Sequence, residues 1–494
     1  MGRHSKKVVT SCGNNRRESG YYSTPNFIAE FLTRKSLELL PNGKQVIDPC
    51  VGKEELISAF YAAGKKITGI DIHDYNVHKK AYFIQKDFID IYSNYKNINL
   101  LNSNEFLVAE YDYWIANPPY NCHEIDYIQT NKHKLKALFS DVGVHNMYAL
   151  FISAIIDMTR VGAIIALITF DSFLTSKAHK KLRQKILNNT SLHYLILCPT
   201  DLFWAQKADV RTCMLILQKG TAFQSTVNIS NRPKNTEALK NILINDDFDK
   251  TERVDIILDS YMDSQEWIIG VPGEIRALFR DDNRIGNTFK CITGISTGND
   301  KKYLSPIKDP SHTIPFYKNP GSRKFFSKED SYLVNNFLDI EKSVRSFIVR
   351  NKALLYKAGI SCSSMGIEFS ACYLPPKSTY GVNPNIICEE ADIWWLMAYL
   401  NSDLVSYMVR GVLIRTNMIT SGYASRIPIA AFSKQCKQEL EALAKKAYEF
   451  SKRTMRKPEQ ELNEINIKIY ECLNMSQETR QFLVQFKHDI LRLT

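Results

Sequence analysis

The sequence predicts an α/β fold in which helices cover both faces of a parallel sheet, followed by a second domain of mixed α+β structure. Between residues 45 and 220, short β-rich runs alternate with segments of helical periodicity, and this alternation is typical of parallel sheets. From about residue 270 onward, Gly- and Ser-rich turns mix with short apolar runs and the alternation is lost. A chain of 494 residues is also too long for one ordinary domain.

Each element of the first domain follows from a short run of residues. The run AIIALITF at 163–170, for example, has the continuous apolar character of a strand that is buried on both faces. We expect strands at 45–49, 67–72, 81–88, 112–117, 163–170, 192–198 and 211–218, with helices at 54–63, 147–160 and 175–188. Residues 230–265 are polar and charged and are expected to form a connector. Helices are expected again near 391–409, 436–453 and 458–473, and the two domains are placed at 1–260 and 261–494.

Composition limits the class of protein. Hydrophobic residues make up 44% of the chain and charged residues 23%, as in globular rather than disordered proteins. The 64 Lys and Arg exceed the 52 Asp and Glu, and the formal net charge of +12 would attract a polyanion such as nucleic acid.

No apolar run approaches the length of a membrane span and no signal peptide is recognisable, so a cytoplasmic protein without a membrane partner is expected. The 11 Cys include no Cys-x-x-Cys pair, so neither a metal site nor a disulfide is expected.

Polar residues follow four of the expected strands, at the point where each strand ends. Asp48, Asp71, Asp87 and Asn117 occupy these positions in chain order. In a parallel sheet the carboxyl ends of the strands meet at one edge, where ligands of α/β proteins bind. The sequence therefore predicts a binding crevice built from these four residues.

The acidic members of this set suit a nucleoside. Asp71 can accept hydrogen bonds from ribose hydroxyls, and Asp87 can accept from an adenine amine. Gly52 has no Cβ, so the turn at 48–52 allows close approach of the backbone to a ligand. The phosphate-binding Gly-x-Gly-x-x-Gly pattern is absent. A nucleoside ligand without phosphate, such as S-adenosyl-L-methionine, therefore fits better than a dinucleotide.

The run NPPY at 117–120 suits methylation of an exocyclic amine. The nitrogen lone pair of such an amine is delocalised into the ring, and two acceptors aimed at its hydrogens would help to free it. The side-chain oxygen of Asn117 and a neighbouring backbone carbonyl can act as that pair, while Pro118 and Pro119 stiffen the loop. Tyr120 can stack on a base that has left the duplex. The alternative is a plain Pro-Pro turn with a capping Asn.

These motifs and their order resemble the amino-group DNA methyltransferases, in particular the γ-group adenine-N6 enzymes of the TaqI type. The resemblance covers most of the chain and implies a Rossmann-like, S-adenosylmethionine-dependent methyltransferase domain followed by a target-recognition domain. It implies that Phe203 is a second aromatic side chain against the flipped base. The donor site implied by the resemblance comprises Tyr22, Thr24, Asp48, Gly52, Asp71, Ile72, Asp87, Phe88 and Asn117, with Thr24 at the carboxylate of the donor.

The chain departs from the family at Glu54, where the first donor motif usually has a glycine. A carboxylate there could crowd the methionine end of the donor or contact its ammonium group, or it could cap the following helix. Capping is the interpretation that we favour. This position affects individual donor contacts and leaves the identity of the donor unchanged.

The resemblance also implies double-stranded DNA as the partner, bound by a monomer, and allows a cognate restriction endonuclease in the same cell. Asn417 is a candidate for reading base edges. The candidate phosphate contacts are Lys301, Lys302, Lys318, Arg323, Lys324, Arg410, Arg415 and Arg426.

Three other functions stay open at this point. The acceptor could be the N4 amine of cytosine, although the family tends to use Ser or Asp where this chain has Asn117. The same catalytic site could act on RNA or on a protein glutamine, although such enzymes usually lack the long C-terminal region. The chain could also be a DNA-binding subunit that has lost catalysis, which the intact motifs argue against.

Overall fold

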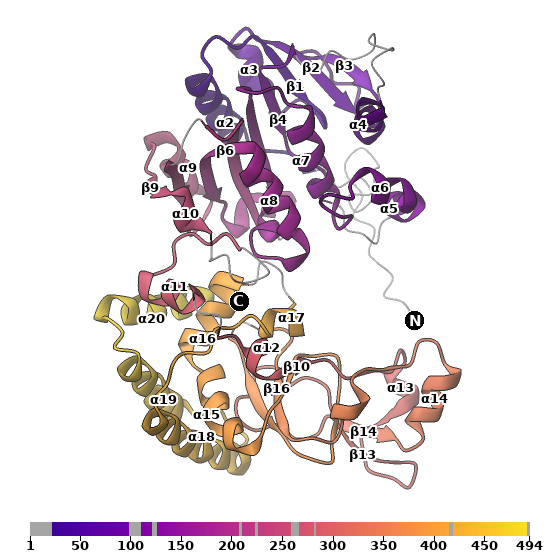
Figure 1. Ribbon diagram of the computed structural model, residues 1–494, viewed down its shortest axis with the longest axis vertical. Coiled ribbons are helices and arrows are strands. Elements are labelled where there is room, and N and C mark those ends of the chain that lie inside the picture. The colour runs from indigo at the N-terminus through magenta and orange to yellow at the C-terminus, as the bar shows by residue number, and fades with distance from the viewer. Residues whose placement is uncertain are drawn as a thin grey trace. The chain divides into compact units, whose positions relative to one another are not determined.

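The computed structural model divides the chain into two compact units, Met1–Gly270 and Val271–Thr494 (Figure 1). The expected boundary at 260/261 lies outside the described residues, ten residues before this division. The residues that the structure describes are 22–97, 110–120, 126–206, 210–222, 226–257, 266–280, 283–366, 368–413 and 418–491.

The described strands of the first unit form one nine-stranded sheet in the order β3-β2-β1-β4-β5-β7-β6-β8-β9. The chain passes from β1 outward to β2 and β3, then crosses back to place β4 on the other side of β1. This reversal opens the crevice in which ligands of doubly wound sheets bind. The strands are β1 (Gln45–Asp48), β2 (Lys66–Asp71), β3 (Tyr82–Gln85), β4 (Tyr113–Ala116), β5 (Ile164–Phe170), β6 (Thr190–Leu197), β7 (Thr212–Lys219), β8 (Thr226–Ser230) and β9 (Asp249–Glu252).

Helices cover both faces of this sheet, as expected (Figure 1). Alternate side chains of β5 enter opposite cores, with Ile165 and Leu167 on one face and Ile164 and Ile168 on the other. A strand buried on both faces needs a continuous apolar run, which explains why 163–170 predicted it correctly. One face carries α2 (Asn26–Leu39), α3 (Ser58–Ala62) and α9 (Thr236–Asn245), and the other α4 (Phe88–Asn97), α7 (Met147–Met158) and α8 (Lys180–Asn189).

Two expectations about this unit were wrong. The sheet is mixed, because β7 is antiparallel to both β5 and β6, and β9 is antiparallel to β8. In its described part, the segment between β6 and β7 contains only the 3-10 helix η4 (Thr200–Gln206). Because a parallel pair needs a long crossover connection, β7 pairs antiparallel with β6. The expected connector also holds structure, since α9, β9 and α10 (Arg253–Ile256) lie within it and β8 just before it.

The described strands of the second unit form three small sheets, which pack with a set of helices. The sheet orders are β10-β19-β16-β17, β11-β15 and β12-β14-β13-β18. The strands are β10 (Lys290–Ile292), β11 (Ile295–Ser296), β12 (Leu304–Ser305), β13 (His312–Tyr317), β14 (Ser331–Val334), β15 (Ile348–Val349), β16 (Gly359–Cys362), β17 (Ala371–Leu374), β18 (Thr379–Tyr380) and β19 (Asn385–Ile387). The longer helices are α15 (Glu390–Leu400), α18 (Lys434–Thr454), α19 (Glu459–Cys472) and α20 (Gln477–Leu491).

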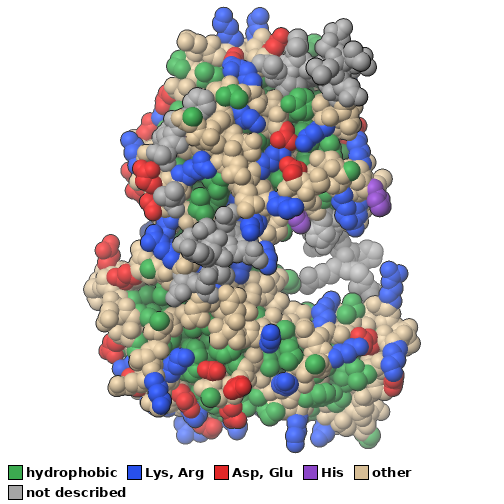
Figure 2. Space-filling view, in the orientation of Figure 1, with side chains coloured by type: hydrophobic (Ala, Val, Ile, Leu, Met, Phe, Trp, Pro, Cys, Tyr) green, Lys and Arg blue, Asp and Glu red, His purple; other side chains and the backbone are tan. Residues whose placement is uncertain are grey.

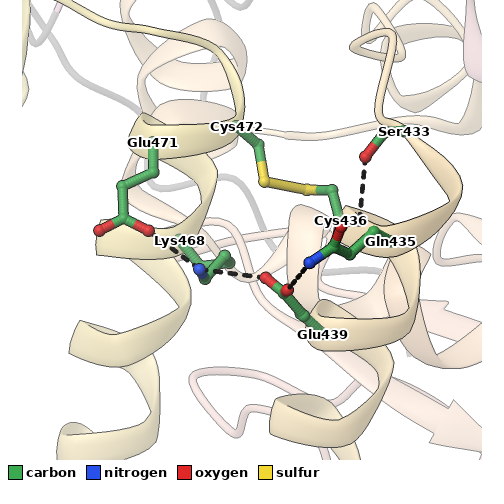
Figure 3. The surroundings of a disulfide bond; sticks show 7 residues. All are labelled: Ser433, Gln435, Cys436, Glu439, Lys468, Glu471 and Cys472. Carbon is green, nitrogen blue, oxygen red and sulfur yellow. Dashed lines mark hydrogen bonds and ion pairs between the residues drawn. A yellow bond between two sulfur atoms is a disulfide. The ribbon is translucent and has the colours of Figure 1, made fainter.

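A disulfide joins Cys436 to Cys472, which corrects the expectation of reduced thiols throughout (Figure 3). A short turn joins α18 to α19, so the two helices run antiparallel and the start of one lies beside the end of the other. Ser433 caps α18 by accepting the N–H of Cys436 at 3.1 Å. The 36-residue separation of the two cysteines carries no sequence signal, and only the helix pairing brings them together.

Within the described ranges, no helix combines the length and the apolar character needed to cross a bilayer. The same ranges contain no group of three or more His, Cys, Asp or Glu side chains placed to hold a metal ion.

Candidate active site

A pocket lies at the carboxyl edge of β1, β2 and β4 in the first unit. All nine residues expected to bind the donor line it: Tyr22, Thr24, Asp48, Gly52, Asp71, Ile72, Asp87, Phe88 and Asn117. They come from five separate stretches of the chain, and the parallel strands bring these together. Pro118, Tyr120 and Phe203 are absent from the lining, whereas Pro119 belongs to it.

The loop after β1 is held by carboxylates that are themselves buried. Asp48 is 1% exposed, and its Oδ1 accepts the N–H of Cys50 at 3.0 Å. Burial raises the pKa of Asp48 to about 8, and the nearby charge of Asp71 adds to this. Gly52, in the left-handed region with a φ of 53°, donates its N–H to Oδ2 of Asp71 at 3.0 Å. The turn at 48–52 is therefore hydrogen-bonded directly to the end of β2.

Asp71 and Asp87 are oriented by different partners. Asp71 also accepts the N–H of His73 at 2.9 Å, and burial raises its pKa. Asp87 accepts the N–H of Ile89 at 2.8 Å, and the hydroxyl of Tyr127 donates to its other oxygen at 2.6 Å. Burial, with help from Asp87, raises the pKa of Tyr127, so the phenol stays protonated as a donor. Sequence analysis missed Tyr127, because nothing in its surrounding residues marks it as part of the site.

Asn117 is held so that its side-chain oxygen remains available. Its Nδ2 donates to the backbone oxygen of Tyr22 at 3.0 Å and to Oγ1 of Thr24 at 2.9 Å. A backbone carbonyl can only accept, so the nitrogen must face Tyr22 and the orientation of the amide is determined. The opposite atom, Oδ1, is buried and has no hydrogen-bond partner among the described residues. Leaving a buried acceptor unsatisfied costs about 1–3 kcal/mol, which a bound N–H donor would recover.

The thiol of Cys50 joins the turn at 48–52 to the loop at 117–120. Its Sγ donates to the backbone oxygen of Asn117 at 3.4 Å, and burial raises the pKa of Cys50 well above its usual value. The thiol therefore stays protonated and acts as a weak donor rather than as a nucleophile.

The aromatic side chains of the site pack against one another. The ring of Tyr120 lies between Tyr22, at a centroid distance of 5.3 Å, and Phe170, at 4.3 Å. Phe203 is wholly buried, and its ring centroid lies 5.8 Å from that of Tyr22. Tyr22 therefore contacts both of the rings that were expected to hold a base.

Glu54 has none of the three roles considered for it. Its φ of 65° breaks the helical path, so α3 begins only at Ser58 instead of at residue 54. The carboxylate is 2% exposed and accepts the backbone N–H groups of Lys79, Lys80 and Ala81 at 3.1 Å each. Its neighbour Glu55 lines the pocket instead, where Oε1 accepts the hydroxyl of Ser23 at 2.8 Å. Glu54 thus anchors the loop before β3, which sequence spacing alone could not reveal.

One candidate phosphate contact does not lie on the protein surface. Lys324 is 3% exposed; its Nζ donates to the backbone oxygen of Asn401 at 2.8 Å and lies 3.3 Å from Glu368, so it cannot act as a surface cation. Arg415 and Asn417 lie outside the described residues. On the face shown in Figure 2, Lys and Arg side chains are dispersed among acidic ones. Six candidate phosphate contacts remain. Lys301 and Lys302 are exposed, and Lys318 is exposed and paired with Asp300. Arg323 is bonded to the backbone of Pro320, Arg426 lies over the ring of Tyr423, and Arg410 is partly buried.

The sequence of the first unit matches a protein family. Residues 9–267, more than half of the chain, match the family model for N-6 DNA methylases. The chain therefore belongs to the N-6 DNA methylase family, and its first unit has the Rossmann-like fold of methyltransferases.

Particular relatives are similar over shorter stretches. The chain is 26% identical over 212 residues to the type II methyltransferase M.BsuBI of Bacillus subtilis, covering 39% of this chain and 41% of the relative. It is 26% identical over 203 residues to the type II methyltransferase M.BanIII of Aneurinibacillus aneurinilyticus, covering 35% and 34%. The matches thus span less than half of the length of these relatives.

Two solved structures share the fold at low sequence identity. The cryo-EM structure of a DrdV–DNA complex aligns with a TM-score of 0.55 at 12% identity, covering 88% of this chain and 57% of that one. The ATP-dependent type ISP restriction-modification enzyme LlaBIII bound to DNA aligns with a TM-score of 0.54 at 11% identity, covering 86% and 39%.

Proposed function

We propose that the chain transfers the methyl group of S-adenosyl-L-methionine to the N6 amine of an adenine that has been flipped out of duplex DNA. The observation that carries this proposal is the buried, unpartnered Oδ1 of Asn117 at the edge of the donor pocket. Membership of the N-6 DNA methylase family supports it.

The residues of the pocket fit this donor. Asp71 and Asp87 offer carboxylate oxygens at two strand ends, where the hydroxyls and the amine of a nucleoside can donate to them. Thr24 and Glu55 line the same pocket and can meet the methionine end. S-adenosyl-L-methionine, when bound, supplies a methyl group made electrophilic by its sulfonium sulfur.

The catalytic loop would act on the acceptor by position and charge. Oδ1 of Asn117 and the backbone oxygen of Pro118 would accept the two amine hydrogens and free the nitrogen lone pair for attack on the methyl carbon. The amine loses its proton only once it carries the methyl group, so no strong base is required. Tyr120 and Phe203 would stack on the base after Tyr22 has moved aside.

The second unit would recognise the target sequence, in the γ-group arrangement of donor motifs first and recognition region last. Double-stranded DNA would be bound by a monomer, with a cognate restriction endonuclease in the cell as a further partner. DNA bound to DrdV and to LlaBIII, two proteins that share the fold, supports DNA as the macromolecular partner.

The test is transfer of labelled methyl groups from the donor to duplex DNA, followed by identification of the modified nucleoside by mass spectrometry. We expect N6-methyladenine, and a loss of about 100- to 1,000-fold in kcat for Asn117→Ala, the range for removing one preorganised catalytic group. Asn241→Ala, at an exposed position of α9, should leave kcat unchanged. N4-methylcytosine, labelled RNA or labelled protein would replace the proposal with one of the alternatives.

A further inference from the structure

A second cavity, of about 360 Å³, lies wholly within the C-terminal unit. Its walls come from the turn after β13, the segment between β16 and β17, and the end of α18 with the turn that follows. We name it the C-terminal pocket and define it by Arg323, Lys324, Glu368, Ser370, Ser451 and Arg456. The donor site makes no use of these residues.

Cationic side chains outnumber carboxylates at the C-terminal pocket. Its described lining holds four cations, Arg323, Lys324, Arg456 and Lys457, and one carboxylate, Glu368. Just outside the lining, Asp330 pairs with Arg323 at 3.4 Å and Glu459 pairs with Lys457 at 3.3 Å. Lys324 and Lys457 lie 3.3 Å and 3.1 Å from Glu368, so two ammonium groups already compensate its charge. Four cations against these three carboxylates leave one positive charge, which the carbonyl end of α18 offsets by about half. The pocket therefore favours an anion over a metal cation.

Two buried hydroxyls in the pocket lack partners. Ser370 and Ser451 are 1% and 3% exposed, and neither Oγ has a hydrogen-bond partner among the described residues. A serine within a helix usually donates to the carbonyl four residues earlier, as Thr454 of the same helix donates to Phe450 at 2.8 Å. Ser451 makes no such bond. Buried hydroxyls without partners are uncommon and indicate a ligand that supplies the missing acceptor.

Arg323, Lys324 and Lys457 already have protein acceptors, so the guanidinium of Arg456 and the two hydroxyls are the donors that a ligand would meet. This donor set matches an oxyanion with several acceptor oxygens, as guanidinium groups and phosphates pair through their forked geometry. We infer that the C-terminal pocket binds a phosphate group, carried by a small phosphorylated molecule or by a nucleic-acid backbone. The inference does not rest on methyl transfer, so either can fail without the other.

The full chain is titrated with inorganic phosphate by calorimetry and by thermal unfolding, at constant ionic strength with chloride as the reference anion. Arg456→Gln removes a charged donor and Ser451→Ala removes a hydroxyl donor of the pocket. Arg453→Gln is the control, because Arg453 is also exposed but belongs to α18 outside the pocket. We expect phosphate affinity to fall about tenfold in the two pocket variants, the effect of one charge-assisted hydrogen bond. Arg453→Gln should bind phosphate as the wild type does.

Unfolding without phosphate separates a lost ligand contact from a damaged fold. Because the hydroxyl of Ser451 has no partner to lose, Ser451→Ala should unfold at the same or a slightly higher temperature.

The source of the phosphate is distinguished with two further ligands, a nucleoside monophosphate and a DNA duplex at several salt concentrations. If the backbone is the source, Arg456→Gln reduces the slope of log affinity against log salt by about one, whereas Arg453→Gln does not. If a small molecule is the source, the pocket variants bind duplex normally and lose the monophosphate. Both outcomes support the inference, which is overturned if Arg456→Gln and Arg453→Gln bind all three ligands alike.

Discussion

The side-chain nitrogen of Asn117 lies 2.9 Å from the hydroxyl oxygen of Thr24, which joins the catalytic loop to a segment 93 residues earlier. Thr24 also lines the donor pocket. A single hydroxyl therefore links the orientation of the proposed catalytic amide to the wall of the proposed donor site.

Replacing this hydroxyl should misplace the amide. In Thr24→Val the Nδ2 of Asn117 keeps only the backbone oxygen of Tyr22 as a partner. We expect kcat for methyl transfer to fall about tenfold, since losing one hydrogen bond of about 1.4 kcal/mol in the transition state has that effect. Thr24→Ser should retain most of the activity, because it keeps the acceptor. Equal kcat values for Thr24→Val and Thr24→Ser would contradict the positioning role.

Asp48 should make folding stability depend on pH. Its pKa of about 8 in the folded protein exceeds its ordinary value of 3.8, so between these values the folded state holds a proton that the unfolded state has lost. The free energy of unfolding should therefore decrease as pH rises through this window, by at most about 1.4 kcal/mol per pH unit for one proton. Denaturant titrations of wild type and Asp48→Asn at several pH values measure the difference. Parallel pH profiles of the two proteins would show that Asp48 is ionised throughout.

Glu54 should matter for stability through the loop that it anchors. The N–H groups of Lys79, Lys80 and Ala81 all reach Oε1 of Glu54, and those of Lys79 and Lys80 also reach Oε2. In Glu54→Gln an amide nitrogen replaces one of these oxygens and cannot accept, and the negative charge is lost. We expect the free energy of unfolding to fall by about 1–3 kcal/mol. Glu237→Gln, at an exposed position of α9, controls for the loss of one negative charge. If both variants unfold alike, the three amides do not depend on the carboxylate.

The disulfide between Cys436 and Cys472 should stabilise the C-terminal unit. It closes a loop of 36 residues, and breaking such a link costs about 2–4 kcal/mol, mostly through the unfolded state. The double variant Cys436→Ala, Cys472→Ala should unfold at lower denaturant concentration than the oxidised wild type. Reduced wild type should match the double variant, and a midpoint unaffected by reductant would argue against the bond in solution.

Features that depend on runs of neighbouring residues could be predicted from the sequence. The apolar run of β5 and the polar residues after β1, β2 and β4 indicated a doubly wound sheet and the residues at its edge. Parallel strands end at a common edge by geometry, so Asp48, Asp71 and Asn117 could be grouped before any contact was known. The direction of β7 could not be predicted from the sequence, because it depends on how the chain turns after β6.

Features that depend on contacts between distant segments required the folded structure. The free oxygen of Asn117 depends on the backbone of Tyr22, and the orientation of Asp87 depends on Tyr127. Burial of Lys324 and the pairing of Cys436 with Cys472 arise from packing in the second unit. Local residue patterns record periodicity and strand ends, whereas side-chain partners are chosen by whichever groups the completed fold brings within hydrogen-bonding distance.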